Sequence, residues 1–118
     1  MRTMMKIFVV SIFALVWLQS NIALANEGLD TVEKWVCSRD ELVRTVRLVA
    51  IEPGKAPCKV FYAKRELDDP NDTKVEAREN SGEIKPIFYA THNGGFCERK
   101  LTEFIQQRQA QKWGCSKL

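Results

Sequence analysis

The sequence predicts a single α+β domain, in which a three- to four-stranded antiparallel meander carries one C-terminal helix packed on one face. Three observations predict this fold class. Segments rich in β-branched residues alternate with turn signals, one long amphipathic stretch lies near the C-terminus, and four cysteines are spread along the chain. The domain is expected to span residues 26–118, a length that suits one hydrophobic core.

Residues 1–25 have the features of a secretory signal peptide. Arg2 and Lys6 precede an apolar run, and Ala-Leu-Ala at residues 23–25 is typical of a cleavage site. The apolar run is shorter than the roughly 20 residues that a membrane-spanning helix needs. The sequence therefore predicts cleavage after Ala25 and a periplasmic or secreted protein without a stable membrane anchor. An uncleaved anchor is the alternative.

The charge of the chain gives little indication of its partner. The whole sequence has 18 basic and 15 acidic residues, and two of the basic residues belong to the signal segment. The mature chain is therefore close to neutral, with basic and acidic residues evenly mixed. This composition does not favour nucleic acid or an anionic membrane as a partner.

The first strands are expected near Trp35–Cys37 and over Leu42–Ile51, after a loose polar lead-in at residues 26–34. The second segment is rich in β-branched residues and is predicted to be the longest strand. Arg44 and Arg47 fall on opposite faces of a regular strand. Either a bulge separates them, or one arginine points inward with its stem buried.

Two more strands and a long connection complete the predicted sheet. Residues 52–57 contain two prolines and a glycine, so they end the long strand, and Cys58–Ala63 forms the second arm of a hairpin. Residues 64–83 are the most polar part of the mature chain and are expected to form a long mobile connection. Ile84–Thr91 is predicted as the last strand, at an edge of the sheet because of Pro86.

The polar connection contains two features with functional alternatives. Its Asp/Asn cluster at residues 68–72 lacks the spacing of an EF-hand loop, so a solvated loop is favoured over a calcium site. Asn71 begins an Asn-Asp-Thr glycosylation sequon, which matters only if the source is eukaryotic.

The amphipathic stretch predicts a helix from about Phe96 to Trp113, covering one face of the sheet. Gly114 is expected to be its left-handed C-cap residue. Its apolar side recurs with the period of an α-helix, and the opposite side is polar. The residues of that stripe are Cys97, Leu101, Phe104, Ile105 and Arg108.

The meander predicts how the four cysteines pair. The chain has no C-x-x-C pair and one histidine, so two disulfides are favoured over a metal site or a redox pair. Successive strands alternate in direction, and the helix descends from the end where the last strand finishes. Cys58 and Cys97 therefore meet at one end of the sheet, and Cys37 and Cys115 meet at the other.

The contexts of these cysteines resemble those of small exported bacterial proteins of unknown function. The shared pattern is W-x-C, then P-C-x-V-x-Y at residues 57–62, then G-F-C at residues 95–97, then W-G-C at residues 113–115. This resemblance implies a periplasmic location and brings no activity, ligand or functional residue with it.

Three hypotheses for function follow from the sequence. The first is a non-enzymatic binding or inhibitor-like module that acts on another envelope or extracellular protein, since the domain is small, stapled and poor in catalytic groups. The second is a small hydrolase or anion-binding enzyme centred on His92, which precedes a glycine-rich turn at the start of the helix. The third is a structural envelope factor. None of them requires a cofactor.

A binding surface is predicted on the sheet face that the C-terminal helix leaves bare. That face is expected to carry Lys59 and Phe61 together with either Arg44 or Arg47. An aromatic ring among cationic side chains suits an interface with a carboxylate-bearing partner. In the alternative, the polar segment 64–83 folds back over this face and Phe61 belongs to a second small core.

Overall fold

The computed structural model describes residues 28–66, 68–69 and 71–118. The predicted signal peptide and its cleavage site lie outside the described residues. Within these ranges, no helix has both the length and the apolar character needed to cross a membrane.

An α+β architecture is confirmed, although the predicted number of strands is too low. Over the described residues, five antiparallel strands form one sheet in the order β4-β3-β2-β1-β5. The strands are β1 (Asp30–Arg39), β2 (Leu42–Ala50), β3 (Cys58–Lys64), β4 (Phe88–Ala90) and β5 (Gly114–Lys117).

Both ends of the predicted meander differ from the structure. The prediction of a loose lead-in over residues 26–34 is wrong from Asp30 onward. β1 begins at Asp30, and this residue pairs with Ala50 at the end of β2. The last predicted strand shortens to β4, which pairs only with β3. The sequence did not predict β5. This strand pairs with β1, and Cys115 lies directly opposite Cys37.

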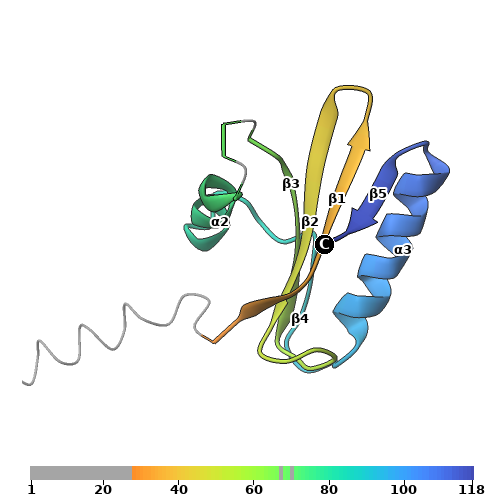
Figure 1. The fold of residues 1–118 in the computed structure, drawn as a ribbon. Helices are drawn as coiled ribbons and strands as arrows, with labels where there is room; N and C mark the ends of the chain where they lie inside the picture. The colour runs from red at the N-terminus through yellow and green to blue at the C-terminus, as the bar shows by residue number, and fades with distance from the viewer. Residues whose placement is uncertain (1–27, 67, 70) are drawn as a thin grey trace, which may run out of the picture.

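The predicted amphipathic helix is present as α3 (Phe96–Ala110), and it covers one face of the sheet (Figure 1). The Tyr62 and Phe104 rings meet edge to face, with their centroids 5.0 Å apart. The Arg108 guanidinium lies 4.7 Å from the centre of the Phe104 ring, which is a cation–π contact. The buried core between α3 and the sheet comprises Cys37, Val46, Leu48, Ala50, Cys58, Val60, Cys97, Leu101, Phe104 and Ile105.

The end of α3 lies earlier than predicted. Lys112 rather than Gly114 takes the left-handed conformation, with a φ of 72°. The Trp113 backbone N–H returns to the carbonyl of Arg108 at 3.0 Å and closes the last turn. Gly114 is therefore free to begin β5, and the C-cap prediction for it is wrong.

The two disulfides join the pairs that the meander predicts. Cys37–Cys115 links β1 to β5 across 78 residues of sequence, and Cys58–Cys97 links β3 to α3 across 39 residues. Disulfides of this kind are typical of proteins in an oxidising compartment outside the cytoplasm.

The polar connection 64–83 contains a second helix that was not predicted. This helix, α2 (Thr73–Asn80), lies on the face of the sheet opposite α3, so the sheet is covered on both sides (Figure 1). The prediction of one helix, and of a mobile connection without structure, is therefore wrong.

Removal of the disulfide that ties α3 to the sheet should cost about 4 kcal/mol of unfolding free energy in the chain-entropy model for a loop of this length. We expect the Cys58→Ala/Cys97→Ala double variant to lose this amount in urea melts at neutral pH, with the far-UV spectrum of the fold retained. An unfolding free energy equal to that of the wild type would show that α3 is held by packing alone.

Candidate binding site

The start of α2 depends on Asp69. Its carboxylate accepts hydrogen bonds from the Thr73 hydroxyl at 2.6 Å and from the Lys74 backbone N–H at 2.6 Å. These two bonds hold the pKa of Asp69 below its ordinary value. At the other end, Gly82 adopts a φ of 82° and its N–H donates to the Glu79 carbonyl. The helix is thus fixed at both ends by local hydrogen bonds.

The face that α2 turns toward the sheet is mostly polar. Its buried residues are Val75 and Glu79. A single valine provides little apolar burial for a helix of this length. Polar contacts must therefore supply most of the attachment of α2 to the sheet.

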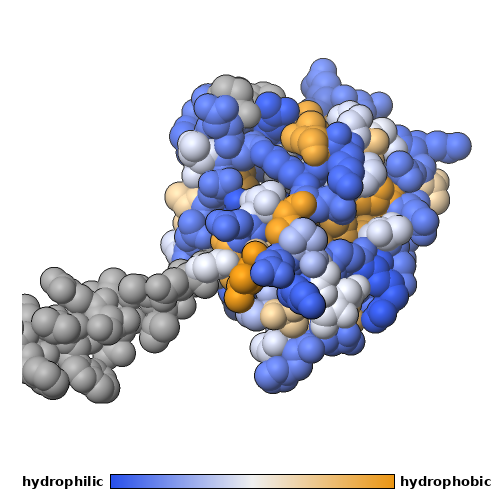
Figure 2. All heavy atoms as spheres, turned by 60° about the horizontal axis from the view of Figure 1, so that its bottom comes forward, coloured by the Kyte–Doolittle hydropathy of each residue, from blue (hydrophilic) through white to orange (hydrophobic). Residues whose placement is uncertain are grey.

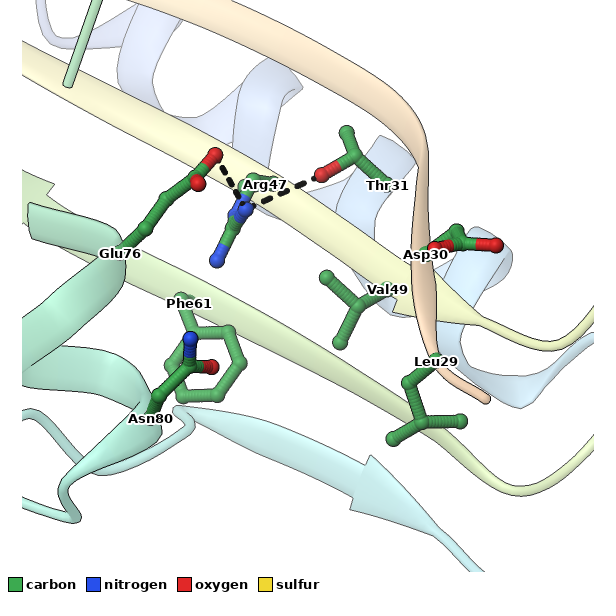
Figure 3. A pocket seen from close by; sticks show the side chains of 8 residues that line it. All are labelled: Leu29, Asp30, Thr31, Arg47, Val49, Phe61, Glu76 and Asn80. Atoms are coloured by element: carbon green, nitrogen blue, oxygen red, sulfur yellow. Dashed lines mark hydrogen bonds and ion pairs between the residues drawn. The ribbon is translucent and has the colours of Figure 1, made fainter. Parts of the chain in front are cut away.

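Arg47 on β2 provides the main contact with α2. Its guanidinium donates to Glu76 Oε1 at 2.7 Å through Nη1 and to the Glu79 carboxylate through Nη2. Nη1 also donates to the Thr31 hydroxyl on β1 at 3.1 Å (Figure 3). The Arg47 side chain is 12% exposed and that of Glu79 is 2% exposed. This ion pair therefore lies between α2 and the sheet rather than on the surface.

Burial raises the pKa of the Glu79 carboxyl above its ordinary value, although the hydrogen bond from Arg47 opposes the shift. The folded protein therefore binds the Glu79 proton more tightly than the unfolded chain does. By linkage, the contribution of Glu79 to stability is most favourable below its ordinary pKa and decreases as the pH rises through its folded pKa.

A second, partly buried ion pair lies beside the first. Lys34, which is opposite Arg47 in the β1–β2 register, donates to the Asp72 carboxylate at 2.6 Å. The Arg65 Nε lies 3.8 Å from the same carboxylate. Basic groups of the sheet therefore meet acidic groups of α2 and of the turn that precedes it.

A pocket of about 300 Å³ opens between α2 and the start of β1. Val49, Phe61 and Leu29 form its apolar part, and the Arg47–Glu76 pair forms one wall (Figure 3). The register of β1 shifts between Thr31 and Glu33, so that Thr31 lies opposite Val49. The lining residues are Leu29, Asp30, Thr31, Arg47, Val49, Phe61, Glu76 and Asn80.

The structure brings together only part of the predicted binding surface. Arg47 and Phe61 meet at the pocket, and Lys59 follows on the same face of β3. Arg44 lies on the α3 face, opposite Cys37, and donates to its neighbour's carbonyl. No register shift separates the two arginines along the β2–β3 pairing. Of the two alternatives, an inward-pointing arginine is therefore the one observed.

The expectation that Phe61 is exposed on a bare face is wrong. Phe61 is 3% exposed, because α2 folds back over this face of the sheet. The alternative, a second small core under the polar segment, is the one observed. The polar network of Arg47 adjoins this small core.

His92 is more exposed to solvent than Arg47. It is exposed and borders an open hollow of about 320 Å³. The lining of that hollow contains no acidic residue and no cysteine, and consists of Tyr89, Ala90, Thr91, His92, Asn93 and Phe96. The neighbouring glycine has a structural role, since a Cβ on Gly94 would lie 2.6 Å from the Gly54 carbonyl oxygen.

The acidic cluster at the start of α2 acts within the fold. Asp69 accepts the Lys74 backbone N–H in the first turn of α2, Asp72 pairs with Lys34, and Asp68 pairs with Lys74. Asp69 and Asp72 are buried, so the prediction of a solvated loop is wrong for these two residues. Across residues 28–66, 68–69 and 71–118, no group of three or more potential metal ligands is present. Asn71, the first residue of the sequon, is exposed.

Comparisons with protein-family models, with curated proteins and with solved structures find no match to this chain. Function is therefore inferred from the geometry and charge of the described residues.

The sequence did not identify Glu76 and Glu79, the acidic partners of Arg47, as residues of this site. Thr73 and Glu76 have the Thr-x-x-Glu spacing that often starts a helix, and Glu76 and Glu79 are three residues apart, on one side of a helix. These signals are present but weak. They become meaningful only when Arg47 is known to point toward them.

Replacement of Arg47 by methionine should destabilise the fold by about 3 kcal/mol at pH 7.5, because it leaves Glu79 buried without its cation. The loss should shrink toward pH 4.5, since Glu79 then takes up a proton and needs no partner. Urea melts at both pH values measure this difference. The matched control is Arg44→Met on the opposite face of the same strand, for which we expect a small change at both pH values. An equal loss for Arg47→Met at pH 7.5 and pH 4.5 would contradict the role given to the ion pair.

Proposed function

We propose that this chain is an exported, non-enzymatic binding module of the cell envelope, and that the pocket between α2 and the sheet receives a side chain of a protein partner. The observation that carries the proposal is the pocket itself. It combines an apolar part, formed by Val49 and Phe61, with polar groups from two strands and a helix. Concave sites with a few converging polar groups are the usual place for a binding site, although this lining is more polar than most.

The size of the pocket favours one side chain over a large cofactor. Its volume of about 300 Å³ lies at the lower end of the range for small-molecule sites. Interfaces between proteins commonly depend on a few anchor side chains that enter pockets of the partner. A partner that inserts one anchor residue here fits the dimensions better than a nucleotide or a flavin.

The exposed apolar residues outside the pocket are scattered, which favours a contact that is centred on the pocket. The end of the molecule seen in Figure 2 shows its hydrophobic side chains as separate groups among hydrophilic ones. The large apolar residues with substantial exposure are Leu42, Ile51, Ile87, Tyr89 and Leu118. Scattered exposed residues of this kind are normal on soluble domains and need no partner.

Two other hypotheses have less support. An enzyme centred on His92 would need an acid, a base or a nucleophile within reach, and the described lining of the His92 hollow offers no carboxylate or thiol. A structural factor without a ligand would not need a pocket next to a buried Arg–Glu pair. The resemblance of the cysteine contexts to small exported bacterial proteins agrees with an envelope role.

Export can be tested by intact mass. We expect protein recovered from the periplasm or medium to lack residues 1–25 and to begin at Asn26, because Ala-Leu-Ala precedes that residue. The mass should also be lower by four hydrogens for the two disulfides. Recovery of membrane-bound protein that retains Met1 would contradict export by a cleaved signal.

The binding role can be tested with a pair of tryptophan variants on one face of β1. Thr31 lines the pocket, whereas Ser38 lies at the far end of the same strand and is exposed. We expect the wild type and Ser38→Trp to capture the same envelope protein in a cross-linking pull-down, and Thr31→Trp to lose it because the indole blocks the pocket. Equal capture by both variants, or no protein captured specifically by the wild type, would contradict the proposal.

A further inference from the structure

We infer that the α3 face of the sheet carries a second binding surface, a cationic patch of Arg44, Lys64 and Arg108 that receives acidic side chains of a protein partner. The cationic patch lies apart from the pocket beside α2, because Arg44 and Arg47 are on opposite faces of β2. Binding at the cationic patch therefore does not depend on the pocket.

Two strands and a helix bring the three cations together. Arg44 and Lys64 lie directly opposite each other on β2 and β3. Alternation along the strands places both on the α3 face, where Val46 and Tyr62 form the next opposite pair. Arg108 comes from the last turn of α3, and its guanidinium lies 5.8 Å from the centre of the Tyr62 ring. The three cations therefore lie around one aromatic ring.

The described part of the chain pairs no carboxylate with the cationic patch. Arg44, Lys64 and Arg108 form no ion pair with any described residue. The Nε of Arg108 is buried and has no hydrogen-bond partner among the residues described. Like charges that lie directly opposite each other on a sheet are destabilising. The free protein therefore has an electrostatic cost at this place that a bound anion would remove.

Another pair of opposite cations in the same sheet shows the contrast. Lys34 lies opposite Arg47 on the α2 face, and the fold itself supplies carboxylates for both side chains. Those carboxylates belong to Asp72, Glu76 and Glu79. The cationic patch repeats this arrangement on the α3 face without such acids. We therefore expect a partner to bring them.

An acidic polypeptide suits the cationic patch better than a membrane surface does. Arg44 and Arg108 each carry a guanidinium, which can bind a carboxylate through two parallel hydrogen bonds. Basic clusters that recognise anionic lipids usually contain roughly four to eight lysines and arginines. The cationic patch is smaller than that, and the mature chain is close to neutral.

The test uses two blocked tetrapeptides, one made of glutamates and one made of glutamines. Binding to the full mature chain is followed by backbone amide shifts in NMR. At about 20 mM salt, we expect the glutamate peptide to shift the amides of Arg44, Tyr62 and Lys64, and to bind about tenfold more tightly than the glutamine peptide. Raising the salt to about 500 mM should remove most of this difference. Vesicles of phosphatidylglycerol should not bind.

Matched variants locate the contact. Arg44→Gln, Lys64→Gln and Arg108→Gln should each weaken binding of the glutamate peptide about threefold. Lys55→Gln, in the turn at the other end of β2 and β3, and Arg99→Gln, near the start of α3, should leave the affinity unchanged. Both control residues are exposed.

The stability of the free protein gives a second readout. Lys64 is exposed, so its replacement by glutamine removes a charge with little loss of packing. At about 20 mM salt, Lys64→Gln should raise the melting temperature by about 2 °C, because it relieves the repulsion from Arg44, and about 500 mM salt should remove this gain. One substitution should therefore weaken peptide binding and stabilise the free protein.

Several results would overturn the cationic patch. These are equal binding of the two peptides, an unchanged affinity in all three patch variants, and a melting temperature of Lys64→Gln at low salt that does not rise. Loss of peptide binding in Thr31→Trp would move the acidic contact to the pocket beside α2. Binding to the vesicles without binding of the glutamate peptide would replace the protein partner by a membrane. The pocket is tested separately by the tryptophan pair on β1.

Discussion

The buried guanidinium of Arg47 is the constraint on which the α2 side of the molecule depends. An arginine that points from a central strand onto a covered face must be paired, because an unpaired buried charge costs several kcal/mol. Glu76 and Glu79 provide that pairing from a helix of eight residues, a length at which isolated helices are marginal in water. The position of α2, the burial of Phe61 and the shape of the pocket all follow from this contact.

The two faces of the sheet are held by different forces. The α3 face is an apolar core, closed by Cys58–Cys97 and by the edge-to-face contact of Tyr62 with Phe104. On the α2 face the buried apolar residues are Val49, Phe61, Ala63 and Val75, and ion pairs from Lys34 and Arg47 add the polar contacts. Segments with few apolar contacts open more readily than the core of a domain. The candidate site therefore combines a disulfide-linked sheet with a helix that is held by few apolar contacts.

The sequence predicted the features that depend on regular patterns. The stripe through Cys97 and Leu101 marks α3, and the alternating directions of a meander lead to the cysteine pairing. α2 could not be predicted in the same way, because its polar sequence has no apolar stripe and its stability comes from Arg47, 29 residues earlier. The alternation of β2 places Arg44 and Arg47 on opposite faces, but it does not say which face a second helix covers. β5 was missed for a similar reason, since it depends on the opposing strand β1 and the bond between Cys37 and Cys115.

Amide hydrogen exchange of the Arg47→Met variant at neutral pH tests the dependence of α2 on Arg47 most directly. Reporter amides in α2 and its end are those of Glu76 and Ser81, which donate to the carbonyls of Asp72 and Ala77. If Arg47 holds α2 on the sheet, these amides should lose nearly all their protection in the variant, while those of β2 and β3 remain protected. Protection of Glu76 and Ser81 equal to that in the wild type would contradict this dependence.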